Sequence, residues 1–232
     1  MTLCQITRAE LKGHMARIAR VVVPGHPHHV TQRGNRKQRT FFCDDDYRAY
    51  MRLVSKELER AGAEVWAYCL MPNHVHLVVV PGHERSLALL FKEAHRKYTR
   101  RINLREGWRG HLWQERFYSF PMDEQHNNAA VRYIELNPVD AGICEAPTDW
   151  RWSSVHAHIR GEDDILVSAK PMLKRFPDWC GFLDLEDPSV TISQLRKHGK
   201  TGRPAGDDAF IERLEKLTGR TLRKGKPGPG RS

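Results

Sequence analysis

Up to about residue 145, the hydrophobic and polar positions follow two alternating periods. Three stretches have the β-branched and aromatic residues typical of strands and stop at turn residues: "HHVTQRG" (28–34), "AEVWAYCLM" (63–71) and "HVHLVVV" (74–80). Pro72 and Asn73 separate the second stretch from the third, which predicts a β-hairpin. We therefore expect at least three strands, two of which pair directly.

Apolar residues at helical spacing fill the intervals between and after these strands. Residues 44–62 begin with three acidic residues and end at a glycine, which are typical helix start and stop signals. A second helix is predicted from Leu87 to Leu104, with Ser86 as its cap, and a third from Asn127 to Leu136. The order β-α-β-β-α predicts an α+β fold with a ferredoxin-like or RRM-like antiparallel sheet and helices on one face.

Two histidines open the third predicted strand. In a strand, residues i and i+2 point to the same face, so His74 and His76 project together while Val75 faces the other way. Two imidazoles at this spacing can each place a ring nitrogen on one divalent cation and leave positions open for substrate oxygens. The alternative is that both histidines lie on a solvent-facing side of the sheet and bind nothing.

The second predicted helix is strongly basic around a tyrosine. Tyr98 is flanked by four cations, Arg96, Lys97, Arg100 and Arg101. Guanidinium groups can hold a phosphate diester near the tyrosine hydroxyl, and they favour the phenolate. The alternative is core packing, because Tyr98 also fits the apolar stripe formed by Leu87, Phe91, Ala94 and Ile102.

The formal charge of +10 is unevenly distributed along the 232 residues. Residues 196–232 hold eleven Lys/Arg against four Asp/Glu, whereas residues 123–187 hold thirteen acids against six bases. Residues 92–116 carry eight bases against three acids, and 31–39 carry four bases and no acid. Clustered basic residues are typical of a nucleic-acid partner, and the alternative is a solvated basic surface.

Aromatic and cationic residues alternate after the basic helix. Trp108, Trp113 and Phe117 interleave with Arg105, Arg109 and Arg116. Unpaired bases can stack on such side chains along a basic groove, which favours single-stranded nucleic acid. The alternative for Trp113 and Phe117 is a buried aromatic packing motif.

Cysteine usage and hydropathy indicate the compartment. The five cysteines are isolated and odd in number, so neither a disulfide framework nor a structural zinc site is predicted. No apolar run approaches the ~18 residues of a membrane span, and no secretory leader is evident. We expect a cytoplasmic protein without membrane contact. The histidines of "GHPHH" (25–29) are interpreted as part of a strand-entry loop.

Several motifs carry a resemblance to a known family. In chain order they are "PGHPHHVTQRGNRKQ" (24–38), "MPNHVHLVVVP" (71–81), "KYTRRIN" (97–103), "GHLWQERF" (110–117) and "YIELNPVDAG" (133–142). Over residues 15–158 the sequence resembles the HUH single-strand transposases with one catalytic tyrosine. More narrowly, it is similar to the REP-associated tyrosine transposases, relatives of the insertion-sequence enzymes that cut and join single-stranded DNA.

The resemblance implies roles for particular residues. It implies a ferredoxin-like fold with His74 and His76 as the metal-binding pair and Tyr98 as the nucleophile on the facing helix. In insertion-sequence members a polar residue four positions after the tyrosine helps to hold the metal. Ile102 stands there in this chain, so Asn103 is the nearest candidate ligand. The candidate DNA-binding residues are Arg33, Arg96, Lys97, Arg100, Arg101, Arg116 and Arg203.

The resemblance also implies a reaction and a substrate. Mg²⁺ or Mn²⁺ on the histidine pair would polarise the scissile phosphate, and tyrosine attack would leave a 5′-phosphotyrosine and a free 3′-hydroxyl. One phosphodiester is exchanged for another, so rejoining needs no ATP, and the chain has no G-x-x-x-x-G-K-[ST] loop. The expected substrate is single-stranded DNA that contains a hairpin, and the expected state is a monomer.

The sequence divides into four parts by composition. Residues 1–14 are an extension with no assigned role, residues 15–158 are the transposase domain, and residues 159–190 are an acidic linker segment. Residues 191–232 are predicted to be a basic DNA-binding extension with one short helix, capped by Asp207 or Asp208, and a disordered end over the last nine residues. Its "GRP" segment, which includes Arg203, is similar to the arms of minor-groove binders.

Two other function classes remain open from the sequence. A non-catalytic relative could bind nucleic acid on the same fold as a repressor or RNA-binding module. Alternatively, His74 and His76 could hold Zn²⁺ in a hydrolase that uses water as its nucleophile. Removal of the metal and replacement of the tyrosine distinguish these classes.

Overall fold

A computed structural model of the chain describes residues 18–185 and 190–224. Its first part follows the predicted order of elements. They are β1 (His28–Arg33), α1 (Asp44–Ala61), β2 (Ala63–Met71), β3 (His74–Pro81), α2 (Ser86–Glu106), β4 (Tyr118–Pro121) and α3 (Glu124–Asp140), with a short 3-10 turn (Asn35–Lys37) after β1. The predicted strands and helices are confirmed; β4 was not predicted, because only four residues of strand follow a long loop.

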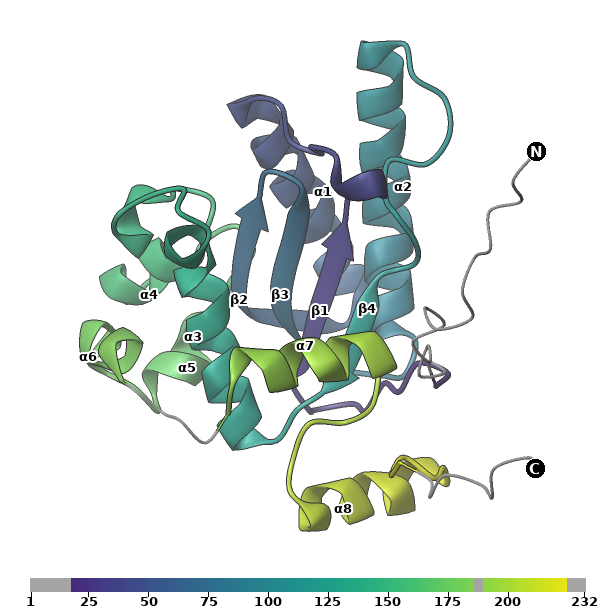
Figure 1. Cartoon of the computed structure of the whole chain (residues 1–232), viewed down its shortest axis with the longest axis vertical. Coiled ribbons are helices and arrows are strands. Elements are labelled where there is room, and N and C mark those ends of the chain that lie inside the picture. Colours follow the sequence, from purple (N-terminus) through teal and green to yellow (C-terminus); the bar gives the residue numbers. More distant parts are fainter. Residues whose placement is uncertain (1–17, 186–189, 225–232) are drawn as a thin grey trace, which may run out of the picture.

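The sheet is antiparallel throughout, with strand order β2-β3-β1-β4, so the predicted antiparallel α+β fold is confirmed. β3 lies inside the sheet and is buried on both faces, which explains why it reads as a nearly continuous apolar run. Helices α1 and α2 cover one face, as Figure 1 shows behind the strands, and α3 lies against the other. Helices on one face were predicted from the sequence, and α3 extends the cover to the second face.

The two faces bury different residues of β3. Val75, Leu77 and Val79 belong to the apolar cluster beneath α1 and α2. Val78 belongs to the separate cluster beneath α3. His74 and His76 share the face of Val78, because alternate residues of a strand point the same way. The histidine pair therefore lies on the α3 face, opposite to α2.

A pair of glycines closes the junction between α1 and β2. Gly62 ends α1 in the left-handed region, at φ 54°, and its backbone N–H returns to the carbonyls of Glu59 and Leu58. Gly82 donates its N–H to the Gly62 carbonyl at 2.7 Å, and a Cβ at Gly82 would lie 2.6 Å from that oxygen. The sequence prediction that α1 stops at Gly62 is confirmed.

The C-terminal part continues the fold with further helices. They are α4 (Val155–Arg160), α5 (Lys170–Leu173), α6 (Trp179–Asp184), α7 (Ile192–Thr201) and α8 (Asp208–Thr218), preceded by a 3-10 turn (Pro147–Asp149). Trp179, Phe182 and Leu183 are buried in the cluster beneath α3. The prediction of an acidic linker over 159–190 is therefore wrong for its described part, because α5 and α6 pack as part of the domain.

Helix α8 packs against the start of the described chain. Phe210 and Leu214 form a small apolar cluster with Val21 and Val23. Asp207 accepts a hydrogen bond from the Phe210 N–H at 2.6 Å, which confirms Asp207 as the cap. Residues 1–14 and all but one of the last nine residues lie outside the described residues. Within the described ranges, no helix is long and apolar enough to cross a bilayer.

Candidate active site

The histidine pair forms the centre of the candidate site. The His74 and His76 rings are 4.9 Å apart between centroids and nearly perpendicular, on the α3 face of β3. His76 is 7% exposed, and its Nε2 has no hydrogen-bond partner. A buried nitrogen without a partner costs free energy unless something binds it. The prediction that the two side chains share one face, away from Val75, is confirmed.

Hydrogen bonds orient both rings. The Nδ1 of His74 donates to Asn73 Oδ1 at 2.6 Å, which leaves Nε2 with its lone pair. His76 Nδ1 lies 3.0 Å from Nε2 of His29, a buried histidine on β1. When His76 donates in this bond, its own Nε2 is also free to bind a cation. A partner that holds the far nitrogen of a ligand in this way is typical of metal sites.

All three imidazoles are held in the neutral form. Burial lowers the pKa of His74 to about 3, with a further contribution from the Arg33 guanidinium. Burial lowers the pKa of His29 to about 4. Burial, followed by the charges of His74, His29, Arg33 and Arg196, holds the pKa of His76 well below its usual value. A neutral imidazole is the form that binds a metal.

Tyr133 on α3 is the tyrosine that contacts this pair. Its ring meets the His76 ring edge-on, with centroids 5.4 Å apart at 83°, and it lies 6.3 Å from the His29 ring. Asn137, which is 6% exposed, follows one helical turn later, so its side chain projects from the same side of α3. Two imidazoles, a phenol and an amide therefore gather on one face of the sheet.

Buried contacts fix the position of α3. Asp123 caps its N-terminus by accepting the His126 N–H at 2.8 Å. Glu135, two residues after Tyr133 and fully buried, accepts hydrogen bonds from Ser154 Oγ at 2.5 Å, His158 Nδ1 at 2.7 Å and Trp179 Nε1 at 2.8 Å. These bonds tie α3 to the C-terminal helices, which holds Tyr133 against the histidines.

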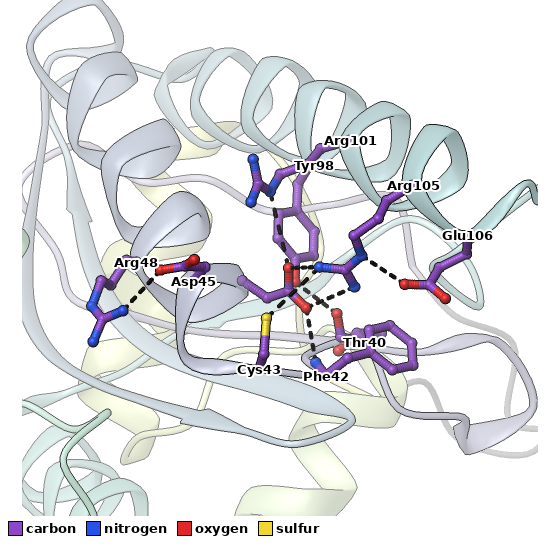
Figure 2. A network of polar contacts seen from close by, with 10 residues as sticks. Thr40, Phe42, Cys43, Asp45, Arg48, Tyr98, Arg101, Arg105 and Glu106 are labelled. Carbon is purple, nitrogen blue, oxygen red and sulfur yellow. Dashed lines mark hydrogen bonds and ion pairs between the residues drawn. The ribbon is translucent and has the colours of Figure 1, made fainter.

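Tyr98 lies elsewhere, and the prediction that it faces the histidine pair is wrong. It is fully buried beneath α2 with Val75, on the opposite face of the sheet from His76. Its hydroxyl donates to the Thr40 carbonyl at 2.6 Å, as Figure 2 shows. Burial and the nearby Asp46 carboxylate raise the pKa of the phenol, contrary to the expected phenolate. The core-packing alternative describes this residue.

Two cations near Tyr98 interact with a buried carboxylate. Asp46 receives two hydrogen bonds from Arg105, at 2.5 and 3.0 Å, and lies 4.0 Å from Arg101 Nε. Figure 2 shows this network between α1 and α2, with Tyr98 beside it. Burial raises the pKa of Asp46, but the Arg105 guanidinium and the Phe42 and Cys43 N–H groups hold it below its usual value. This arrangement joins two helices through ion pairs with Asp46.

Asn103 is also separated from the histidine pair. It sits near the end of α2, and its amide donates to the Gly110 carbonyl at 3.0 Å. The prediction of Asn103 as a metal ligand is therefore wrong, because α2 and the histidines lie on opposite faces of the sheet. Asn137 occupies the position, four residues after the site tyrosine, in which a polar ligand was expected.

The donor set at the site fits a divalent cation. Among the described residues, no group of three or more His, Cys, Asp or Glu side chains is arranged to hold a metal. Two neutral imidazoles, with Asn137 on the adjoining side of α3, supply fewer ligands than a closed structural zinc site. The unpartnered Nε2 of buried His76 is the observation that favours a bound cation. Such a site keeps coordination positions for substrate oxygens.

The candidate DNA-binding residues fall into different surroundings. Arg33 is exposed, pairs in register with His74 and lies at the histidine site. Arg96 pairs with Glu93 at 2.8 Å, and Lys97 pairs with Glu57 at 2.5 Å. Arg203 donates to the carbonyls of Leu222 and Arg223, so it holds the end of the described chain. Arg100 is exposed on α2, where Arg101 contacts Asp46 as described above.

A cleft of about 780 Å³ lies between α2 and the segment before β4. Its lining combines aromatic and cationic side chains, among them Phe91, Trp113, Phe117, Lys92, Arg96 and Arg116. Two buried polar atoms of the lining, Gln32 Oε1 and Trp113 Nε1, have no hydrogen-bond partner. Trp113 and Phe117 are thus buried core residues that also line a cleft. The groove and the buried packing motif, which were alternatives from the sequence, involve the same two side chains.

The neutral buried histidines predict loss of stability in acid. Burial lowers the pKa of His28 to about 4, below its value of about 6.5 in the unfolded chain. Below about pH 6.5 the unfolded chain binds a proton at His28 that the folded state does not bind. The free energy of unfolding therefore falls as the pH drops toward 4. Each such group costs at most ~1.4 kcal/mol per pH unit over this range. Urea unfolding between pH 7.5 and 4.5 measures it.

A variant tests whether His28 contributes to that acid dependence. His28→Gln keeps an acceptor for the Val23 N–H, which the His28 ring accepts at 3.2 Å. We expect a shallower fall of the urea midpoint with pH in this variant than in the native protein. An equally steep fall in both would contradict the assignment of His28 as a group neutral in the folded state.

Three comparisons relate this chain to known proteins. The sequence profile of the family described as IS200-like transposases matches residues 22–137, half of the chain. A Haemophilus influenzae protein named as a REP-associated tyrosine transposase is 27% identical over 110 residues, which cover 43% of this chain and 62% of that protein. The chain thus spans less than two thirds of that relative.

One solved structure supports the fold. The structure of a REP-associated tyrosine transposase bound to a REP hairpin superposes with a TM-score of 0.55 at 22% identity, covering 66% of this chain and 92% of that one. A transposase structure from Deinococcus radiodurans gives a TM-score of 0.37 at 19% identity, covering 51% of this chain and 95% of that one.

Proposed function

The chain belongs to the IS200-like transposase family, and from this membership we propose that it cleaves and rejoins single-stranded DNA through Tyr133. The observation that carries the proposal is the contact between the Tyr133 and His76 rings, 5.4 Å apart, beside the unpartnered Nε2 of His76. This contact supports a nucleophile and a cation-binding group within reach of one phosphate. Tyr98 takes no part.

The site residues have separate roles in the proposed reaction. His74 and His76 would hold a divalent cation through their Nε2 atoms, with Asn137 on the Tyr133 side of α3 as a further candidate ligand, and the cation would supply Lewis-acid polarisation of the phosphate. His29 orients the His76 ring through the 3.0 Å bond between them. Tyr133 is held by α3 so that its hydroxyl approaches the phosphorus.

The reaction exchanges one phosphodiester for another. The Tyr133 Oη–P bond forms and the P–O3′ bond breaks, which leaves the DNA 5′ end on the tyrosine. The phenol proton is released, and the departing 3′ oxygen takes up a proton to become a hydroxyl. Attack by a 3′-hydroxyl on the phosphotyrosine reverses these changes and joins strands. The energy of the broken bond is retained, so no nucleotide cofactor is needed.

Manganese and magnesium are the proposed metals. Imidazole ligands favour manganese, whereas magnesium prefers oxygen ligands and keeps its waters. With only two imidazoles at the site, oxygen atoms of Asn137, water and the substrate phosphate would complete the coordination of either ion. The competing hypothesis is a zinc-dependent hydrolase, and it predicts cleavage that does not depend on Tyr133.

The proposed substrate is single-stranded DNA that folds into a hairpin. The structural neighbour with the same fold is bound to a REP hairpin. The proposed site residues lie on β1, β3 and α3, and a monomer is the proposed active unit.

The cleft beside α2 is proposed to bind unpaired nucleotides of this substrate. Gln32 and Arg33 are consecutive on β1 and point to opposite faces, so a strand that passes the end of β1 can reach both the cleft and the histidine site. Aromatic walls with cations around them suit base stacking and phosphate contacts. Gln32 Oε1 and Trp113 Nε1 supply an acceptor and a donor for a base edge.

Trp113→Phe tests this cleft by removing the indole N–H while keeping an aromatic wall. We expect single-stranded DNA to bind about fivefold more weakly, because one hydrogen bond to the base is lost. Fluorescence anisotropy with a labelled oligonucleotide measures the change. Trp108→Phe is the matched control, since Trp108 is 42% exposed and packs on Phe42 outside the cleft lining. Equal effects of both exchanges would contradict the assignment.

A covalent trapping experiment tests the proposed function. The native protein is incubated with end-labelled single-stranded hairpins and Mn²⁺ or Mg²⁺, then run on a denaturing gel. We expect a labelled band at the mass of the protein plus DNA that resists SDS and is absent with EDTA. Cleavage without such a band would favour a water nucleophile. Binding without cleavage with either metal would favour a non-catalytic nucleic-acid-binding protein.

A further inference from the structure

Helix α7 lies over the catalytic face although it comes from the C-terminal part of the chain. Figure 1 shows it across the lower ends of the strands, on the side of α3. Leu195 is 2% exposed and belongs to the apolar cluster that contains Tyr133. The family profile ends at residue 137, so this helix is an addition to the matched part of the chain.

Both ends of α7 are capped, which fixes the helix. Thr191 Oγ1 accepts the Gln194 N–H at 3.3 Å, and Gln194 Oε1 accepts the Thr191 N–H at 2.6 Å, a capping box. Gly202 ends the helix in the left-handed region at φ 71°. The caps therefore fix where the backbone of α7 begins and ends on the α3 face of the sheet.

Arg196 extends from this helix to the proposed nucleophile. Its guanidinium carbon lies 6.0 Å from the centre of the Tyr133 ring. No carboxylate of the described residues lies within ion-pair distance of Arg196, in contrast to Arg96, Arg101 and Arg105 on α2. Residues 192–201 contain no acid at all. An uncompensated cation is thus held beside the tyrosine and the histidine pair.

We propose that Arg196 binds a non-bridging oxygen of the scissile phosphate while Tyr133 attacks it. This inference rests on the proposed function. As the Tyr133 Oη–P bond forms and the P–O3′ bond breaks, negative charge grows on the equatorial oxygens. A guanidinium donates charge-assisted hydrogen bonds to them in a fixed geometry. Arg196 is then a catalytic residue supplied by the C-terminal part.

Arg196→Gln tests the proposal by removing the charge and shortening the donor. We expect the rate of phosphotyrosine formation at saturating DNA to fall about a hundredfold, the usual effect of losing one such donor. The Kd for the same hairpin, measured in the Tyr133→Phe background, should change less than about threefold, because one phosphate contact among several is lost. Arg196→Lys should recover part of the rate, since it keeps the charge without the fork.

Lys197→Gln is the matched control on the same helix. Leu195 points into the core, so Lys197, two residues on, projects about 200° around the helix and away from the sheet. We expect it to retain the native cleavage rate. A native rate in Arg196→Gln, or an equal loss in Lys197→Gln, would overturn the proposal.

The salt dependence of binding separates this proposal from the proposed function. If the native protein forms no covalent complex, the proposed function fails. Phosphate binding by Arg196 can still be tested by equilibrium binding. Arg196→Gln should lower the slope of log Kd against log salt by about 0.7, the value for one phosphate contact on a single strand. An unchanged slope in that case would exclude Arg196 from phosphate binding.

Discussion

Tyr133→Phe is expected to abolish the covalent protein–DNA complex while leaving the fold intact. The phenol supplies the proposed nucleophile, and phenylalanine keeps the ring that packs edge-on against His76 at 5.4 Å. Because no other described tyrosine contacts the histidine pair, loss of this hydroxyl removes the covalent route, and we expect strand cleavage to fall by about a thousandfold or more. Denaturing gels of labelled hairpins with Mn²⁺ measure both products.

Tyr98→Phe is the matched control for this exchange. It removes the same hydroxyl from a tyrosine on the other face of the sheet, where the group donates to the Thr40 carbonyl at 2.6 Å. We expect the covalent complex to form normally and the free energy of unfolding to fall by about 1–3 kcal/mol, because a buried acceptor is left unpaired. A covalent complex that survives in Tyr133→Phe and is lost in Tyr98→Phe would reverse our assignment.

The error over the tyrosine has a physical origin. Tyr98 carries two signals at once, a neighbourhood of cations and a place in the apolar stripe of α2. Sequence alone does not show that Asp46, from α1, engages Arg101 and Arg105. Nor does it show which face of the sheet a helix covers, since both faces of β3 are apolar and accept one.

A local signal for the tyrosine that contacts the histidine pair was present in the sequence. "YIELNP" places Tyr133 on the helix predicted over 127–136 and Asn137 four residues later, just after its predicted end, which is the spacing that the resemblance required of a tyrosine and its polar neighbour. The same test fails at Tyr98, where Ile102 stands four residues on. A search of every tyrosine on a predicted helix for a polar residue four positions later would have selected Tyr133.

The parts of the fold set by local rules were predictable. The two-residue turn at Pro72 and Asn73, the stop at Gly62 and the cap at Asp207 are each decided by residues adjacent in sequence. The role of His29 was not predictable, because its contact with His76 joins positions 47 residues apart across two strands. Likewise, Trp179 meets Glu135 only in the folded chain, so residues 159–190 read as a linker by charge alone.

Metal binding should depend on His76 more than on any other described side chain. His76→Ala removes the buried ring whose Nε2 has no hydrogen-bond partner, and we expect Mn²⁺ affinity to fall by about a hundredfold or more. His29→Leu leaves the ligand in place but removes the bond that orients it, and a loss of about tenfold to a hundredfold is expected. Isothermal titration with Mn²⁺ and no DNA measures both.

His28→Gln is the control for these histidine exchanges, since His28 is equally buried on β1 but shares the face of Val30, away from the site. It should bind Mn²⁺ like the native protein, which separates loss of a ligand from general loss of packing. If His28→Gln weakened binding as much as His76→Ala, the metal would not sit at the histidine pair. If His29→Leu had no effect while His76→Ala abolished binding, His76 would be a ligand whose ring the strand alone orients.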